Sequence, residues 1–103
     1  MEQITRIPTH PGDVLKEELE ARNISQKDFA QKIGLSYTML NEILNGKRPV
    51  TTDFALIIEA ALGINPDLLM NMQVRYNMAQ SRCKSVMIER LNQVRKVCAS
   101  WML

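Results

Sequence analysis

The stretch from Ser36 to Arg48 contains side chains whose types and spacing could bind a nucleic acid. If its first part is helical, one face carries mostly uncharged hydrogen-bonding residues: Ser36, Tyr37, Thr38, Asn41, Glu42 and Asn45. Two cations, Lys47 and Arg48, follow directly after Gly46. Base edges in DNA are read by neutral hydrogen-bonding groups and arginine forks, whereas phosphates are held by cations and helix N-termini. The combination predicts a surface for double-stranded DNA.

The side chains of this stretch divide into two predicted roles. Asparagine is suited to N6 and N7 of adenine, so Asn41 is the best candidate for base reading, with Tyr37 and Thr38 beside it. Contacts with the DNA backbone are expected from residues at or near helix ends: Gln26, Ser36, Asn45, Lys47 and Arg48. An acid facing phosphates is unfavourable unless it accepts a hydrogen bond from cytosine N4 or a neighbouring lysine. We therefore place Glu42 at the periphery of the surface.

Two short helices with a glycine turn between them should position these residues. Ser25 and Ser36 are suitable N-caps for helices over 26–33 and 37–45, and Gly34 can take the positive φ that ends the first helix. Apolar residues at helical spacing would fill the angle between the helices: Phe29, Ala30, Ile33, Leu35, Leu40 and Ile43. This pattern is typical of a helix-turn-helix, whose second helix enters the major groove. An ordinary helical hairpin is the alternative, which the neutral polar face and the two cations disfavour.

Helix signals recur in the rest of the chain and strand signals are nearly absent, so we expect an all-α fold. Residues 1–9 read as an extended arm, followed by a helix over 12–22. His10, which precedes a proline, is expected to cap or pack rather than to bind a ligand. A further helix should begin after a cap at Thr51 or Thr52. Its buried face should comprise Phe54, Ile57, Ile58 and Ala61.

The last predicted helix starts at Asn65-Pro66-Asp67, and neither glycine nor proline follows it. If unbroken, it would run to the end of the chain, with Ser81 and Ser85 as places where it could bend. Its apolar stripe recurs at steps of three and four, which is typical of a helix–helix seam. We expect dimerisation, or in second place contact with another partner, through Leu69, Met72, Tyr76, Met87, Leu91 and Trp101. The basic residues between them form a solvated face or touch flanking DNA.

The composition fits one small domain with a modest core, since 46% of the 103 residues are hydrophobic. The net charge is +2, but residues 1–62 carry seven Lys/Arg and nine Asp/Glu, whereas residues 63–103 carry six and two. DNA binding must therefore depend on local placement of charge rather than on its total. Cys83 and Cys98, with no histidine beside them, make no metal-ligand pattern and fit a reducing cytoplasm.

Several other classes of protein are disfavoured. No run of 18 apolar residues is present, and the N-terminus lacks the pattern of a secretion signal, so we expect no membrane segment. A Ser/His/Asp set, a paired carboxylate site and a glycine-rich phosphate loop are also missing. We therefore expect neither an enzyme nor a binder of a cofactor, metal or small-molecule substrate.

Residues 26–45, QKDFAQKIGLSYTMLNEILN, resemble the helix-turn-helix of the lambda-repressor-like (Xre) regulators. Three further stretches extend the resemblance: HPGDVLKEEL at 10–19, LNGKRPVT at 44–51 and LMNMQVRY at 69–76. Together they make the chain similar to the HigA-type antitoxins of toxin–antitoxin operons, also called plasmid maintenance system antidote proteins. The resemblance covers about residues 8–80 and implies a lambda-repressor-like arrangement. Together with the last predicted helix, we expect about five helices in this arrangement with a C-terminal helical extension.

The resemblance also implies a function. Members of this family are cytoplasmic homodimers that bind operator DNA over their own promoter and neutralise a HigB-type toxin, usually a small basic mRNA endonuclease. We divide the chain into an arm at 1–9, a DNA-binding domain at 10–80, and an extension at 81–103. The extension runs past the usual end of the family, so its expected role in dimerisation or partner contact rests on the apolar stripe and not on the resemblance. Glu17, Glu18 and Glu20 would then be a solvated face or, less simply, an acidic dock for the toxin. Two alternatives remain, a stand-alone Xre-type regulator without a toxin and a protein-interaction module that reuses the fold.

Overall fold

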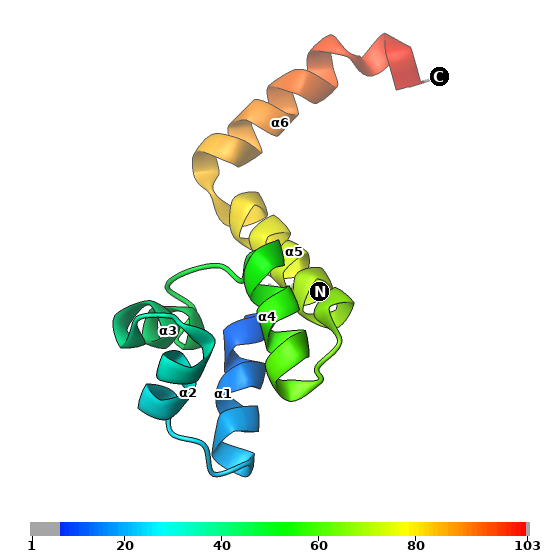
Figure 1. Cartoon of the computed structure of the whole chain (residues 1–103). Helices are drawn as coiled ribbons and strands as arrows, with labels where there is room; N and C mark the ends of the chain where they lie inside the picture. The colour runs from blue at the N-terminus through cyan, green and yellow to red at the C-terminus, as the bar shows by residue number, and fades with distance from the viewer. Residues whose placement is uncertain (1–6, 103) are drawn as a thin grey trace.

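A computed structural model describes residues 7–102, and these residues form helices without any strand (Figure 1). The predicted all-α fold is confirmed. The expected arm at 1–9 lies largely outside the described residues. The elements are α1 (Pro11–Ala21), α2 (Gln26–Ile33), α3 (Tyr37–Leu44), α4 (Thr52–Leu62), α5 (Pro66–Cys83), α6 (Ser85–Val97) and a terminal 3₁₀ turn, η1 (Ala99–Met102).

Helices α1 to α5 form a head around one apolar core. Helix α4 packs on α5, α2 packs on α3, and α1 contacts both α3 and α5. The core comprises Leu15, Leu19, Phe29, Ala30, Leu40, Ile43, Leu44, Val50, Phe54, Ala55, Ile58 and Leu69. Gly12 lets α1 approach α3 closely, because a Cβ atom added there would overlap the carbonyl oxygen of Ile43.

Most helix ends are set by the caps that the sequence predicts. The Ser25 hydroxyl accepts from the Asp28 amide and the Ser36 hydroxyl from the Met39 amide, each at 3.1 Å. Gly34 ends α2 in the left-handed region, with a φ of 74°. These local bonds fix the turn between α2 and α3 and hence the angle at which α3 leaves the head.

The buried face of α4 differs from the prediction. Phe54 and Ile58 are buried as expected, but Ala55 joins them, while Ile57 is 39% exposed and Ala61 is exposed. Nearly every residue of α4 is apolar, so the sequence offers several possible inner strips. The packing of α4 against α5 selects one of them, and Ile57 instead borders a shallow groove between α3 and α4.

His10 caps α1 and joins separate parts of the head. Its Nδ1 accepts from the Gly12 amide at 2.9 Å, and its ring meets the Tyr76 ring edge-on with centroids 4.8 Å apart. Burial lowers the pKa of His10 below 6.5, although the Asp13 carboxylate and a backbone hydrogen bond at Arg48 act in the opposite direction. The neutral imidazole therefore serves as acceptor, and the predicted capping and packing role is confirmed.

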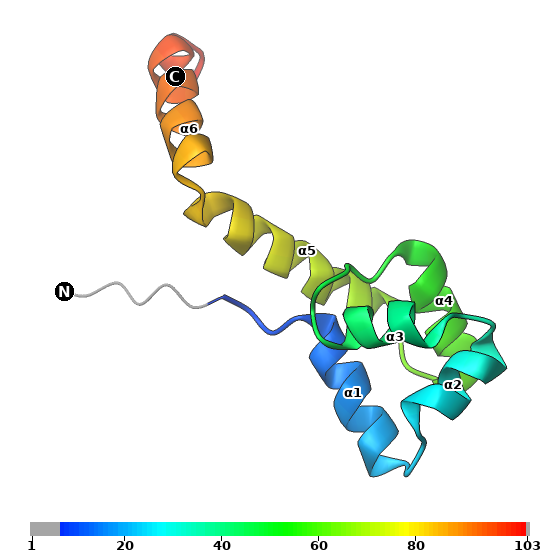
Figure 2. The ribbon, with the colours of Figure 1, turned by 90° about the vertical axis from the view of Figure 1, so that its left-hand side faces the viewer.

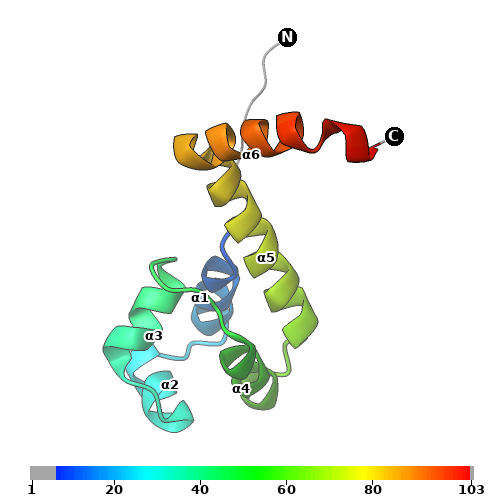
Figure 3. The same ribbon diagram turned by 90° about the horizontal axis from the view of Figure 1, so that it is seen from above.

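The predicted C-terminal helix is broken into two. Helix α5 ends at Cys83, Lys84 is extended with a ψ of 127°, and α6 begins at Ser85 without a side-chain cap. The break lies between the two serines expected to allow a bend, and serine is unfavourable inside helices because its hydroxyl competes for backbone hydrogen bonds. Helix α6 and η1, which we call the tail, project away from the head and give the molecule a long axis of 55 Å (Figures 2 and 3).

Candidate nucleic-acid interface

Helix α3 lies on the surface of the head with its apolar side inward. Leu40, Ile43 and Leu44 are buried against the other helices of the head. Tyr37 and Thr38, at its first turn, are exposed. This is the placement that the sequence predicts for two of the three base-reading residues. A protruding first turn of the second helix is what a helix-turn-helix offers to the major groove.

A directed series of hydrogen bonds connects α1, α3 and α2 along this surface. The Lys16 ammonium donates to the Asn45 side-chain oxygen at 3.2 Å, and the Asn45 amino group donates to the Asn41 oxygen at 3.1 Å. The Asn41 amino group in turn donates to the Gln26 oxygen at 3.0 Å. Lysine can only donate, so it fixes the direction of all three amides. The amino group of Gln26 is the free end of the series, with no hydrogen-bond partner among residues 7–102.

Asn41 is held in place by this series and yet keeps unused hydrogen-bonding capacity. It is partly buried, and its oxygen and nitrogen each make one side-chain hydrogen bond. An asparagine amide has two N–H donors and two acceptor lone pairs. One donor and one lone pair therefore remain, and these are the two groups that a bidentate contact with adenine needs.

Glu42 organises the loop that carries the two cations. Its side chain accepts from Arg48 Nε at 2.6 Å, and its backbone oxygen accepts from the amides of Lys47 and Arg48 at 2.8 and 3.3 Å. The pair is solvent-exposed, so it contributes only about 0–1 kcal/mol to stability. Its main effect is to hold the Arg48 guanidinium in one place. Sequence reasoning placed Glu42 at the periphery and missed this contact, because a separation of six residues is not a helical pair.

A buried glutamine that the sequence did not single out ties this loop to α5. Gln73 accepts from the Val50 amide at 2.7 Å and donates to the Asn77 oxygen at 2.9 Å. A buried amide stabilises the fold only when it is paired, as it is here. The connection after α3 is therefore fixed at both ends, by Glu42 near its start and by Gln73 near its end.

The residues predicted to face a partner are spread over the head and the tail. Leu69 is in the core and has no exposed surface, because it is on the side of α5 that packs on the other helices of the head. It is therefore not accessible to a partner. Met72 and Tyr76 are half-buried in the head, and Met87 and Leu91 are half-buried on the tail. Trp101, in η1, is 82% exposed.

The other charged groups on the described surface make few contacts. Glu18 forms an exposed ion pair with Arg22 at 3.0 Å, and Glu17 and Glu20 are exposed on the same helix. Within residues 7–102, no three metal-binding side chains gather at one point. None of the helices in that range is long and apolar enough to cross a bilayer.

The fold and this surface define a lambda-repressor-like helix-turn-helix protein. A family model described as "Helix-turn-helix" (HTH_3) matches residues 15–69, and the chain belongs to this family, whose members are DNA-binding regulators rather than enzymes. Over 84 residues it is 27% identical to the uncharacterized HTH-type transcriptional regulator YddM of Escherichia coli, covering 82% of this chain and 88% of that protein.

Two solved structures are similar over most of the chain. An addiction module antidote protein of the HigA family from Coxiella burnetii is 29% identical, with a TM-score of 0.72, covering 85% of this chain and 95% of that one. The Pseudomonas aeruginosa antitoxin HigA, solved with the higBA promoter, is 28% identical, with a TM-score of 0.68, covering 73% and 83%.

Proposed function

We propose that this chain is the DNA-binding antitoxin of a type II toxin–antitoxin system. As a homodimer in the cytoplasm it would bind double-stranded operator DNA and repress its own operon, and it would neutralise a HigB-type mRNA endonuclease. The observation that carries the proposal is the exposed neutral face of α3, whose amide side chains are oriented by the series of hydrogen bonds that links Lys16 to Gln26. The similarity to antitoxins, one of them solved with its promoter, supports it.

In this proposal Tyr37, Thr38 and Asn41 read bases. Asn41 uses its free N–H and lone pair on adenine, and Thr38 reaches a base edge or a thymine methyl group. Tyr37 touches a base or a sugar. Because the Asn41 amide is already oriented, binding an adenine costs little further side-chain entropy.

The backbone contacts come from both ends of the helix-turn-helix and from the loop after it. The free amino group of Gln26 donates to a phosphate, as do the backbone N–H groups of α3 near Ser36. The Asn45 amino group already donates to the backbone and side-chain oxygens of Asn41, so Asn45 contacts a phosphate by giving up one of these two bonds. Arg48 Nε is held by Glu42, so its two terminal NH₂ groups are left for a phosphate. Lys47 adds a second charge. No cofactor, metal or catalytic step is part of this function.

Operator binding is tested by a gel shift with DNA from upstream of the chain's own gene, at physiological salt and with excess non-specific competitor. A specific complex is expected. If no specific complex forms, DNA binding is wrong and the reading as a protein-interaction module takes its place.

Toxin neutralisation is tested by co-expression with the adjacent gene. A small basic protein encoded there should co-purify with this chain and should arrest growth when it is expressed alone. If the operator is bound but no such partner exists, the chain is a stand-alone regulator. The similarity to a relative known only as a transcriptional regulator keeps that second function in view.

A further inference from the structure

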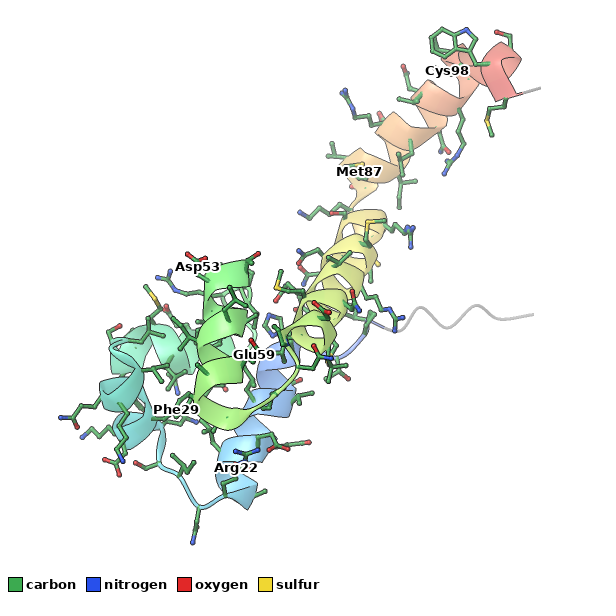
Figure 4. The ribbon with its side chains drawn as sticks, turned by 45° about the vertical axis from the view of Figure 1, so that its right-hand side comes forward. Arg22, Phe29, Asp53, Glu59, Met87 and Cys98 are labelled. Atoms are coloured by element: carbon green, nitrogen blue, oxygen red, sulfur yellow. The ribbon has the colours of Figure 1, made fainter. Side chains whose placement is uncertain are left out.

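Helix α6 has an apolar face that the rest of the described chain leaves uncovered. Six of its 13 residues are large and apolar, and it contains no buried residue. On this face, Ile88, Val94 and Val97 are 46%, 48% and 77% exposed. Its packing neighbours are α5 and η1, and Met87 and Cys98 mark the two ends of a helix that stands clear of the head (Figure 4). An isolated helix of this length is marginal in water, so packing of its apolar face must stabilise it.

The apolar residues of α6 have the spacing of a coiled-coil seam. Met87, Leu91, Val94 and Cys98 follow one another at steps of four, three and four. In a heptad these are positions d, a, d and a, which face a partner helix. Ile88 and Val97 then occupy the flanking positions e and g and widen the seam on both sides.

We propose that this seam pairs, in antiparallel orientation, with α6 of a second copy of the chain. The inference deepens the proposed homodimer by naming the surface that forms it. A two-fold axis then places Leu91 opposite the partner's Val94 and Met87 opposite the partner's Cys98. The same patch of surface serves both copies, as a symmetric dimer requires.

The positive charges that flank the seam favour antiparallel over parallel pairing of two copies. Arg90 and Arg95 occupy a g and an e position. In a parallel in-register pair these positions face each other, so two like-charge pairs would form across a short interface. In the antiparallel pair, Arg90 instead faces the partner's Val97 and Arg95 faces the partner's Ile88. An arginine stem covers an apolar neighbour well while its guanidinium remains in water.

The antiparallel arrangement also separates the two heads. Each α6 is 13 residues long. At 1.5 Å per residue, the two α5 ends are therefore held roughly 20 Å apart, at opposite ends of the paired helices. The two α3 helices are then related by the same two-fold axis that an operator with two half-sites has.

The oligomeric state of the full chain tests the surface. The wild-type protein should have the mass of a dimer at micromolar concentration in sedimentation or light scattering. Leu91→Lys, in the centre of the seam, should convert it to a monomer. Asn92→Lys adds the same charge on the outward face and should stay dimeric. Circular dichroism of all three proteins shows whether the head remains folded.

Disulfide formation tests the direction. In a Cys83→Ser background, Met87→Cys should cross-link to Cys98 of the second copy under mild oxidation, with the linkage identified by peptide mass spectrometry. The two cysteines are 11 residues apart in one helix, too far to bond within a chain. The Cys83→Ser protein alone should cross-link poorly. Rapid Cys98–Cys98 linkage in that protein would show a parallel pair and overturn the proposed direction.

The possible failures are distinguishable from one another. A dimer that survives Leu91→Lys overturns pairing through α6 and leaves the homodimer standing. A wild-type monomer overturns both the homodimer and the pairing through α6. This holds also if α6 turns out to bind anionic vesicles or a different protein. DNA binding is measured separately by gel shift, so neither result decides whether the chain binds an operator.

Discussion

The head and the tail contain similar apolar residues but use them differently. In the head, apolar side chains from all five helices meet in one core, and the amide side chains of Gln26, Asn41 and Asn45 are hydrogen-bonded to one another. In the tail, neither α6 nor η1 contains a buried residue. The comparison shows that helical periodicity alone does not separate a core face from a face that the rest of the described chain leaves uncovered. What separates them is whether another element of the same chain lies opposite.

The largest expected difference between the two regions is in how much stability is lost when an apolar side chain is truncated. Leu40→Ala should lower the free energy of unfolding by about 2–5 kcal/mol, because it leaves a cavity under α3. Val86→Ala, on the outward side of the tail, should change it by less than about 0.5 kcal/mol. Urea denaturation followed by circular dichroism measures both. Equal losses would mean that the tail has a core of its own.

Base reading should belong to the head alone. Asn41→Ala should weaken operator binding by about 1–3 kcal/mol and relax specificity at one base pair, because it removes the paired donor and acceptor. Asn92→Ala, on the tail, should bind like wild type. Gel shifts against a set of operators with single base changes measure both effects. Uniform weakening by Asn41→Ala on every sequence would assign that residue to the backbone instead.

The salt dependence of binding sharpens the comparison for the cations. Arg48→Ala should weaken binding to all sequences alike and reduce the slope of log affinity against log salt by about 1, because one phosphate contact is lost. Lys96→Ala, on the outward face of α6, should leave the slope unchanged. Fluorescence anisotropy across a salt series measures the slopes. A reduced slope for Lys96→Ala would bring the tail into contact with flanking DNA.

The smallest expected effect is a pH dependence that involves only the head. Burial places the pKa of His10 in the folded state below 6.5, so the unfolded chain takes up the proton first as pH falls. The contribution of His10 to stability should be complete above pH 6.5 and decline as pH falls through the folded-state pKa. His10→Asn keeps a side-chain cap without titrating in this range. Thermal melts should show the decline in wild type and a weaker one in His10→Asn.

How much could be predicted from the sequence depends on the range of the interaction. The caps at Ser25 and Ser36 and the turn at Gly34 were predicted correctly, since each depends on a few neighbouring residues. The burial of Ala55 in place of Ile57 was not predicted, because it depends on which side of α4 meets α5.

The site shows the same division. The exposed positions of Tyr37 and Thr38 follow from helical spacing. Other features join residues at separations that no local pattern encodes. The series of hydrogen bonds from the Lys16 side chain to the Gln26 side chain joins three helices, and the contact between Glu42 and Arg48 lies across a turn. The roles of these residues on DNA stay predictions.

The one-way series of amide hydrogen bonds along α3 has a consequence for how operator recognition can evolve. Lys16 sets the direction, so Asn45, Asn41 and Gln26 hold a single joint orientation rather than three independent ones. A new residue at position 41 changes what position 26 presents to the DNA, and the reverse also holds. New specificities should therefore arise through paired substitutions, and a library that varies both positions together should yield functional binders that single-site libraries miss.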